Sequence, residues 1–99
     1  MEQTTEFRYD TQMLINIYDK DVDDQEDELR EYILSNFKGD CLVLAGFEDE
    51  DKDGNPANFL KLHFHTNEPW LVLEHCRSLG EIYDIVIEDM DRQSRGLKG

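Results

Sequence analysis

The spacing of apolar residues switches repeatedly between two periods along this chain, and the order of these segments constrains the fold more than any other feature. Helical spacing occupies residues 21–37 and 69–79. Strand-like alternation or short β-branched runs occupy residues 11–18, 41–45, 59–65 and 82–90. The resulting order, β-α-β-β-α-β, is that of a ferredoxin-like α+β fold, with two helices on one face of a four-stranded antiparallel sheet. We therefore predict this fold, with the spatial strand order 4-1-3-2 and right-handed crossovers.

Residues near the ends of both helical segments provide start and stop signals. Acidic residues gather at the start of the first segment, where they interact favourably with the helix dipole, and Gly39 follows its end. Pro69 suits the first turn of the second helix, and Gly80 follows its last apolar residue. We expect the two glycines to end the helices, with either Asn67 or Glu68 capping the second one.

A polar segment at residues 48–58 connects the second and third strands. It contains the turn signal Asp53-Gly54-Asn55-Pro56. Its alternating acidic residues resemble a calcium-binding loop, but such a loop needs a glycine at a later position and a bidentate glutamate at its end. Gly54 comes too early and Pro56 interrupts the pattern. The segment is therefore predicted to be a solvated hairpin loop.

The charge of the chain limits the partners that it can bind. Its 24 acidic and 10 basic side chains give a formal net charge of −14. Much of the acidic excess falls in residues 19–31 and 48–53. Non-specific binding to nucleic acids or to anionic membranes requires a positive surface, so this acidic protein is not expected to bind either of them.

The length of 99 residues predicts one small domain over residues 1–99, with an ordered core at about residues 8–91 and a flexible tail at 92–99. The apolar runs fall well short of the ~20 residues that span a bilayer, and the first residues lack the pattern of a secretory leader. We therefore expect a cytoplasmic protein without a membrane span. Its two cysteines, Cys41 and Cys76, lie in apolar segments and are predicted to be buried, reduced thiols.

Two histidines at alternate positions of the third strand form the clearest candidate site. His63 and His65 share one face of the strand because side chains alternate along it. In the predicted topology the start of the first strand lies beside the end of the third, which brings Asp10 near both imidazoles. Two histidines and a carboxylate can bind one metal ion. The alternative is a pair of polar histidines on the sheet, hydrogen-bonded to Asp10.

The turn Thr66-Asn67-Glu68-Pro69, which follows the histidines, leads into the second helix. The start of a helix near histidines can hold an anion or phosphate. Ordinary capping by Thr66 or Asn67 is the favoured interpretation, since the turn has no glycine-rich cradle and Glu68 would repel a phosphate. No motif for nucleophilic catalysis surrounds any serine or cysteine, so no catalytic residue is assigned.

The sheet face opposite the helices is predicted to carry apolar side chains. Leu14, Tyr18 and Val86 should point away from the helices. An uncovered face with such residues usually meets another chain or domain. We therefore expect this face to pack in a homodimer or against a neighbouring domain.

Six segments of the sequence carry a resemblance to a known family. They are residues 9–12 (YDTQ), 39–46 (GDCLVLAG), 63–69 (HFHTNEP), 72–74 (VLE), 79–85 (LGEIYDI) and 87–90 (IEDM). Together they resemble the central domain of the fatty acid kinase A subunit family, whose members are also described as dihydroxyacetone kinase-like. The similarity covers nearly all of residues 7–93, and the His-x-His-Thr-Asn-x-Pro run is its most specific part.

The resemblance implies a three-part parent protein with an N-terminal nucleotide-binding kinase domain, a central domain, and a C-terminal domain that engages a fatty-acid-binding partner protein. This chain resembles the central domain only, so no kinase activity is expected from it alone. In relatives, two histidines and a cysteine of the opening strand bind a metal ion, taken to be zinc. His63 and His65 match these histidines, whereas Asp10 stands at the cysteine position. The resemblance therefore implies a zinc or other divalent metal site with one ligand changed.

These observations favour a non-catalytic accessory domain that mediates self-association and domain coupling, with a metal ion at Asp10, His63 and His65. Two alternatives stay open from the sequence. One is a metal-dependent phosphate-handling or hydrolase activity at the same three residues. The other is a small-ligand-sensing module, which rests on fold analogy alone.

Overall fold

The computed structural model describes residues 6–18 and 20–99; the first residues of the chain and Asp19 of the first acidic run lie outside this description. The elements follow the predicted order, with one short helix added at the end. In chain order they are β1 (Tyr9–Asn16), α1 (Val22–Asn36), β2 (Gly39–Phe47), β3 (Phe59–Thr66), α2 (Pro69–Leu79), β4 (Ile82–Asp89) and α3 (Met90–Ser94).

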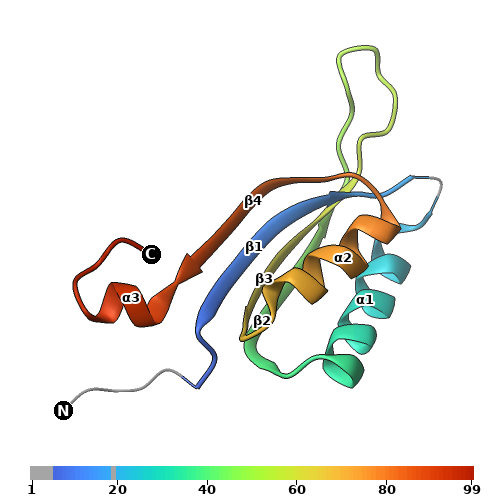
Figure 1. Ribbon diagram of the computed structural model, residues 1–99. Coiled ribbons are helices and arrows are strands. Elements are labelled where there is room, and N and C mark those ends of the chain that lie inside the picture. The colour runs from blue at the N-terminus through green and yellow to red at the C-terminus, as the bar shows by residue number, and fades with distance from the viewer. Residues whose placement is uncertain (1–5, 19) are drawn as a thin grey trace.

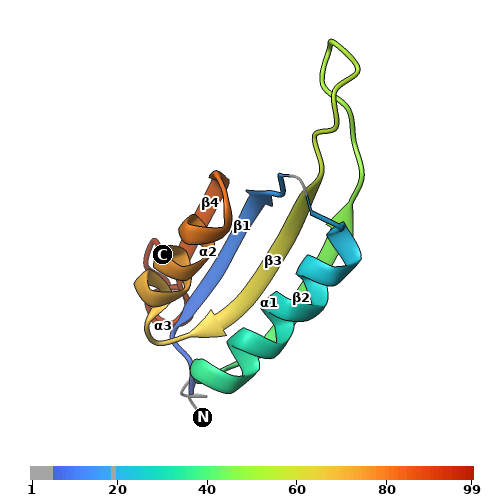
Figure 2. The ribbon, with the colours of Figure 1, turned by 90° about the vertical axis from the view of Figure 1, so that its right-hand side faces the viewer.

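The four strands form one antiparallel sheet in the order β2-β3-β1-β4. Read from the other edge this is 4-1-3-2, so the predicted ferredoxin-like α+β arrangement is confirmed. Helices α1 and α2 both lie on one face of the sheet, and the opposite face is left open by the described elements (Figure 1). The view turned by 90° shows the two helices side by side in front of the strands (Figure 2).

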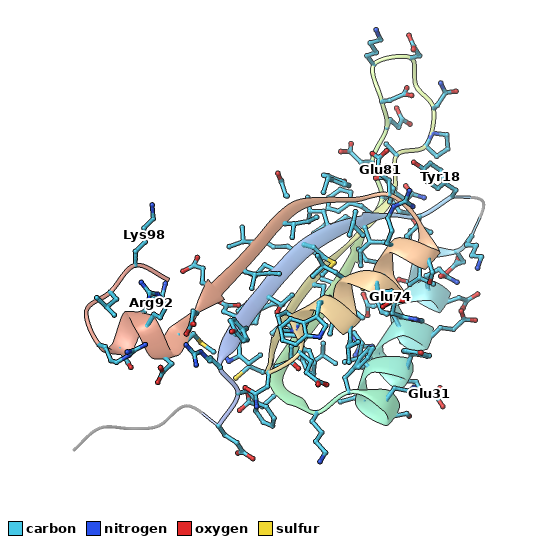
Figure 3. The ribbon with its side chains drawn as sticks, viewed as in Figure 1. Tyr18, Glu31, Glu74, Glu81, Arg92 and Lys98 are labelled. Atoms are coloured by element: carbon cyan, nitrogen blue, oxygen red, sulfur yellow. The ribbon has the colours of Figure 1, made fainter. Side chains whose placement is uncertain are left out.

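The core lies between the sheet and these two helices. Alternate residues of β1 and β3 point into it, and α1 and α2 contribute one apolar stripe each, as the sequence predicts. Its fully buried side chains include those of Met13, Ile15, Leu29, Ile33, Leu60, Leu62, Phe64, Val72 and Cys76. The outer surfaces of the helices carry charged side chains such as Glu31 and Glu74 (Figure 3).

The boundary between α1 and β2 differs from the prediction. The first helix ends at Asn36 and is capped by Phe37, whereas Gly39 is the first residue of β2. Gly39 is needed there for close packing, because a Cβ atom at this position would overlap the ring of Phe64 and the backbone carbonyl of His65. The prediction that Gly39 ends the helix is therefore wrong: it is a packing glycine of the strand.

The segment after β4 contains a helix that the sequence does not predict. Asp89 caps α3 by accepting a hydrogen bond from the backbone N–H of Arg92. The Asp89 carboxylate also lies 2.8 Å from the guanidinium of Arg8. The Arg8 side chain, which donates a hydrogen bond, lowers the pKa of Asp89. These contacts join the beginning of the described chain to its last helix.

The polar segment between β2 and β3 forms the predicted hairpin loop, which projects beyond the sheet in Figure 1. The backbone N–H of Asp51 donates to the carbonyl of Asn55, and the Asp51 carboxylate accepts from the N–H groups of Asp53 and Asn55. These hydrogen bonds, the one from Asn55 first, lower the pKa of Asp51. The acidic side chains of this loop therefore organise its turn.

None of the helices in the described part of the chain has the length and apolarity needed to cross a bilayer.

Helix α1 offers a matched test of the core. Leu29 is 2% exposed and Leu34 is 66% exposed. We predict that Leu29→Ala lowers the free energy of unfolding by about 2–5 kcal/mol, because it removes buried methyl groups and leaves a cavity. Leu34→Ala should change it by no more than about 0.5 kcal/mol. Urea denaturation of both variants measures this, and equal effects would contradict the assigned packing of α1.

Candidate functional site

The pairing of β3 with both neighbouring strands places His65 in a row of acidic residues. His65 lies directly opposite Asp10 of β1 and directly opposite Asp40 of β2. Asp10 in turn lies opposite Glu88 of β4. Directly opposite residues share a face of the sheet, so these side chains cross the open face together.

The three residues predicted as a metal site are brought together by this arrangement. The Asp10 Oδ1 atom lies 3.4 Å from Nδ1 of His63 and 3.8 Å from Nε2 of His65. The two Nε2 atoms of the histidines lie 3.0 Å apart. Gln12, two residues along β1, donates a hydrogen bond to Asp10 and helps to hold its carboxylate. The geometry fits both the metal interpretation and the alternative of a hydrogen-bonded polar cluster.

The site is accessible from solvent without being fully exposed. The side chains of Asp10 and His65 are each 20% exposed and that of His63 is 32% exposed. All three stand on strands whose opposite faces are anchored in the core by Thr11, Leu62 and Phe64. Ligand groups on packed strands have restricted freedom, which favours binding of an ion at a fixed place.

A second group of metal-ligand side chains adjoins the first. Ligand atoms of Asp40, Cys41 and His65 all lie within 4.8 Å of one another. A register shift between Asp40 and Val43 interrupts the β2–β3 ladder at this point, and Cys41 has a φ angle of 54°. The sequence prediction of a buried Cys41 is wrong, because the bulge leaves this residue exposed.

The environments of the two cysteines differ. Partial desolvation, together with the negative charges of Asp40 and Asp10, raises the pKa of the Cys41 thiol. Burial raises the pKa of Cys76 to about 12. Both cysteines are free thiols, as predicted. Cys76 is part of the core, whereas Cys41 is available to solvent and to ligands.

Asp40 and Cys41 belong to the site region but are not among the residues that sequence reasoning selected. The run after Gly39 has the pattern of a buried strand, and that pattern conceals the bulge. The glycine at the start of the strand was the available signal, because glycine in a strand often marks a bulge or a close approach of two chains.

The turn after β3 uses its polar atoms within the protein. The Thr66 hydroxyl donates to the carbonyl of Lys38 at 2.9 Å and accepts from the N–H of Glu68 at 3.3 Å. Asn67 accepts from the N–H of Arg8 at 2.7 Å. Glu68 is the N-cap position, although its own side chain makes no capping bond. The structure thus supports the structural interpretation of this turn over an anion site.

The open face next to the site carries an apolar depression of 580 Å³. The side chains that line it include Leu14 and Val86, as predicted, together with Gln12, Phe47, Phe59 and Lys61. Tyr18 is exposed near the end of β1. Stacking of Phe47 on Phe59, with ring centroids 5.1 Å apart, contributes an aromatic edge to this face.

Comparison with protein-family models matches residues 6–97 to the middle domain of proteins that resemble the fatty acid kinase A subunit. No curated protein and no solved structure matches the chain.

The difference between the cysteines can be tested with a thiol reagent. We predict that, at an alkaline pH that ionises the Cys41 thiol despite its raised pKa, one thiol reacts rapidly in the native protein and the second reacts only after denaturation, because Cys76 is buried and Cys41 is exposed. Cys41→Ser should remove the rapid reaction, and Cys76→Ala should retain it. Absorbance of the released chromophore counts the thiols. Two rapidly reacting thiols in the native protein would contradict the packing of Cys76.

Proposed function

Because this chain belongs to the middle-domain family of fatty acid kinase A-like proteins, we propose that it is a non-catalytic accessory domain of a larger kinase-like protein. In this proposal the domain binds a divalent metal ion, zinc in the first instance, through Asp10, His63 and His65. Its open face mediates self-association and couples it to a nucleotide-binding kinase domain. The partner protein that carries the fatty acid is proposed from the family resemblance alone.

The metal proposal depends above all on the spacing of the ligand atoms. Two nitrogens bound at about 2.0–2.1 Å to a tetrahedral zinc ion stand about 3.3 Å apart. The Nε2 atoms of His63 and His65 are 3.0 Å apart, so only a small adjustment separates them from that distance. An oxygen of Asp10 lies within reach of both rings. Imidazole and carboxylate groups together suit zinc and related divalent ions.

The charge around the site favours a structural ion over phosphate chemistry. Asp10, Asp40 and Glu88 stand in one row with His65. Carboxylates in such a row attract a divalent cation and repel an anionic substrate. When bound, the metal ion would supply positive charge that offsets the mutual repulsion of these carboxylates, and it would tie β1 to β3. We therefore favour the accessory role over the phosphate-handling alternative.

The apolar depression supports the proposal of self-association. Val86 is 41% exposed and Phe47 is 44% exposed, and both line the open face with Leu14. Covering such side chains removes apolar surface from water, which stabilises association. The same face would serve a second copy of the domain or a neighbouring domain of the larger protein.

Metal binding can be tested on protein purified without a histidine tag. We predict that one zinc ion binds per chain and that His63→Ala or His65→Ala lowers the affinity at least about tenfold. The control is His75→Ala, since His75 stacks on Tyr32 at a centroid distance of 3.6 Å, on the helical side of the protein. Competition with a chromogenic chelator measures the affinities. Equal affinities for all three variants would contradict the assigned site.

Self-association can be tested by sedimentation velocity across a range of protein concentrations. We predict a dimer that Val86→Lys dissociates, because this change places a charge in the apolar depression. Leu34→Lys is the control, since Leu34 is exposed on α1, which packs on the other face of the sheet. A wild-type protein that stays monomeric at high concentration would count against self-association through this face.

A further inference from the structure

We propose that Asp40, Cys41 and Nδ1 of His65 form a second metal site, which takes a thiophilic divalent ion. This ion lies on the β2 side of His65, whereas the ion of the proposed function lies on the β1 side of the same ring. The inference goes beyond the proposed function, because the second site uses neither Asp10 nor His63.

The two ring nitrogens of His65 face different partners. Nε2 lies 3.8 Å from Asp10 Oδ1 and 3.0 Å from Nε2 of His63. Nδ1 lies 3.5 Å from Oδ1 of Asp40 on the other neighbouring strand. The two nitrogens of an imidazole are distinct ligand atoms that point in different directions. The ring of His65 therefore offers one binding atom to each of the two groups.

The spacing of the ligand atoms on the β2 side suits a single ion. Ligand atoms of Asp40, Cys41 and His65 all lie within 4.8 Å of one another. Nitrogen, oxygen and sulfur atoms on one tetrahedral zinc ion stand about 3.3–3.6 Å apart, as its bond lengths require. The Asp40–His65 distance of 3.5 Å already has this value. The exposed Cys41 side chain closes the remaining distance by rotation about its Cα–Cβ bond.

The bulge in β2 accounts for the position of the thiol. The β2–β3 pairing passes from Asp40 to Val43, and β2 has one residue more than β3 in this interval. Leu42 packs against the core, while Cys41 is exposed and has a φ angle of 54°. Residues other than glycine rarely adopt this conformation, and where they do they cluster at functional sites. Bulges likewise redirect side chains next to such sites.

The charge and chemistry of the second group favour a thiophilic cation. The Asp40 carboxylate and the Cys41 thiolate together balance a divalent ion. Within residues 6–18 and 20–99, no lysine or arginine forms an ion pair with Asp40, so its charge is available to a metal ion. Thiolate ligands select softer ions than carboxylate and imidazole do, and the first group has no thiolate.

The shared ring makes the two sites compete. A neutral imidazole carries its proton on one nitrogen and has a lone pair on the other. An ion at Nδ1 of His65 therefore places the proton on Nε2, which faces Asp10 and His63. The chemistry of the available ion then decides which nitrogen binds, and softer ions favour the side of Cys41.

Cadmium(II) tests this proposal because it is thiophilic and reports thiolate ligation directly. We predict that the freshly reduced wild-type protein with one equivalent of cadmium(II) shows thiolate-to-cadmium charge-transfer absorption in the ultraviolet. Cys41→Ser should lose this absorption. Cys76→Ala, which removes the buried thiol, is the matched control and should keep it. Absence of the absorption in the wild-type protein, or its persistence in Cys41→Ser, would overturn the proposal.

Histidine variants separate the second site from the first. His63→Ala should keep the absorption and bind cadmium at least as tightly as the wild-type protein, whereas His65→Ala should bind it at least about tenfold more weakly. Loss of the absorption in His63→Ala, or an unchanged affinity in His65→Ala, would overturn the proposal. The proposed function is judged separately by zinc affinity. Absorption without a zinc site at His63 overturns only the proposed function, and a zinc site without absorption overturns only the second site.

Discussion

The backbone pairing of β3 with β1 on one side and β2 on the other is the constraint on which the candidate site depends. It places His65 between Asp10 and Asp40, which are far apart in the sequence. Neither carboxylate could be held beside the imidazole by local structure alone. The ladder hydrogen bonds fix the register, and the register decides which side chains share a face.

The same strand serves the core and the site because its side chains alternate. Leu60, Leu62 and Phe64 are buried against the helices, whereas His63 and His65 face the open side. A shift of one residue would exchange these two sets, so the apolar packing of β3 also holds the imidazoles in place. The stability of the core and the geometry of the site are therefore linked through one strand.

The bulge in β2 is the irregularity that most changes the chemistry of the open face. It follows Asp40, which pairs with His65, and it leaves Cys41 exposed next to these two residues.

Apolar periodicity along the chain was enough to predict the order of strands and helices, the antiparallel sheet with two helices on one face, and the meeting of Asp10 with His63 and His65. These follow from local spacing and from a topology with few alternatives. Only the folded structure revealed four features: the exposure of Cys41, the position of Asp40 beside the candidate site, the packing role of Gly39, and the helix α3. Each depends on contacts between distant segments: the bulge on the β2–β3 ladder, Gly39 on the ring of Phe64, and α3 on Asp89, which pairs with Arg8. The spacing of apolar residues within one segment does not depend on such contacts. This is the physical reason why these features could not be predicted from the sequence.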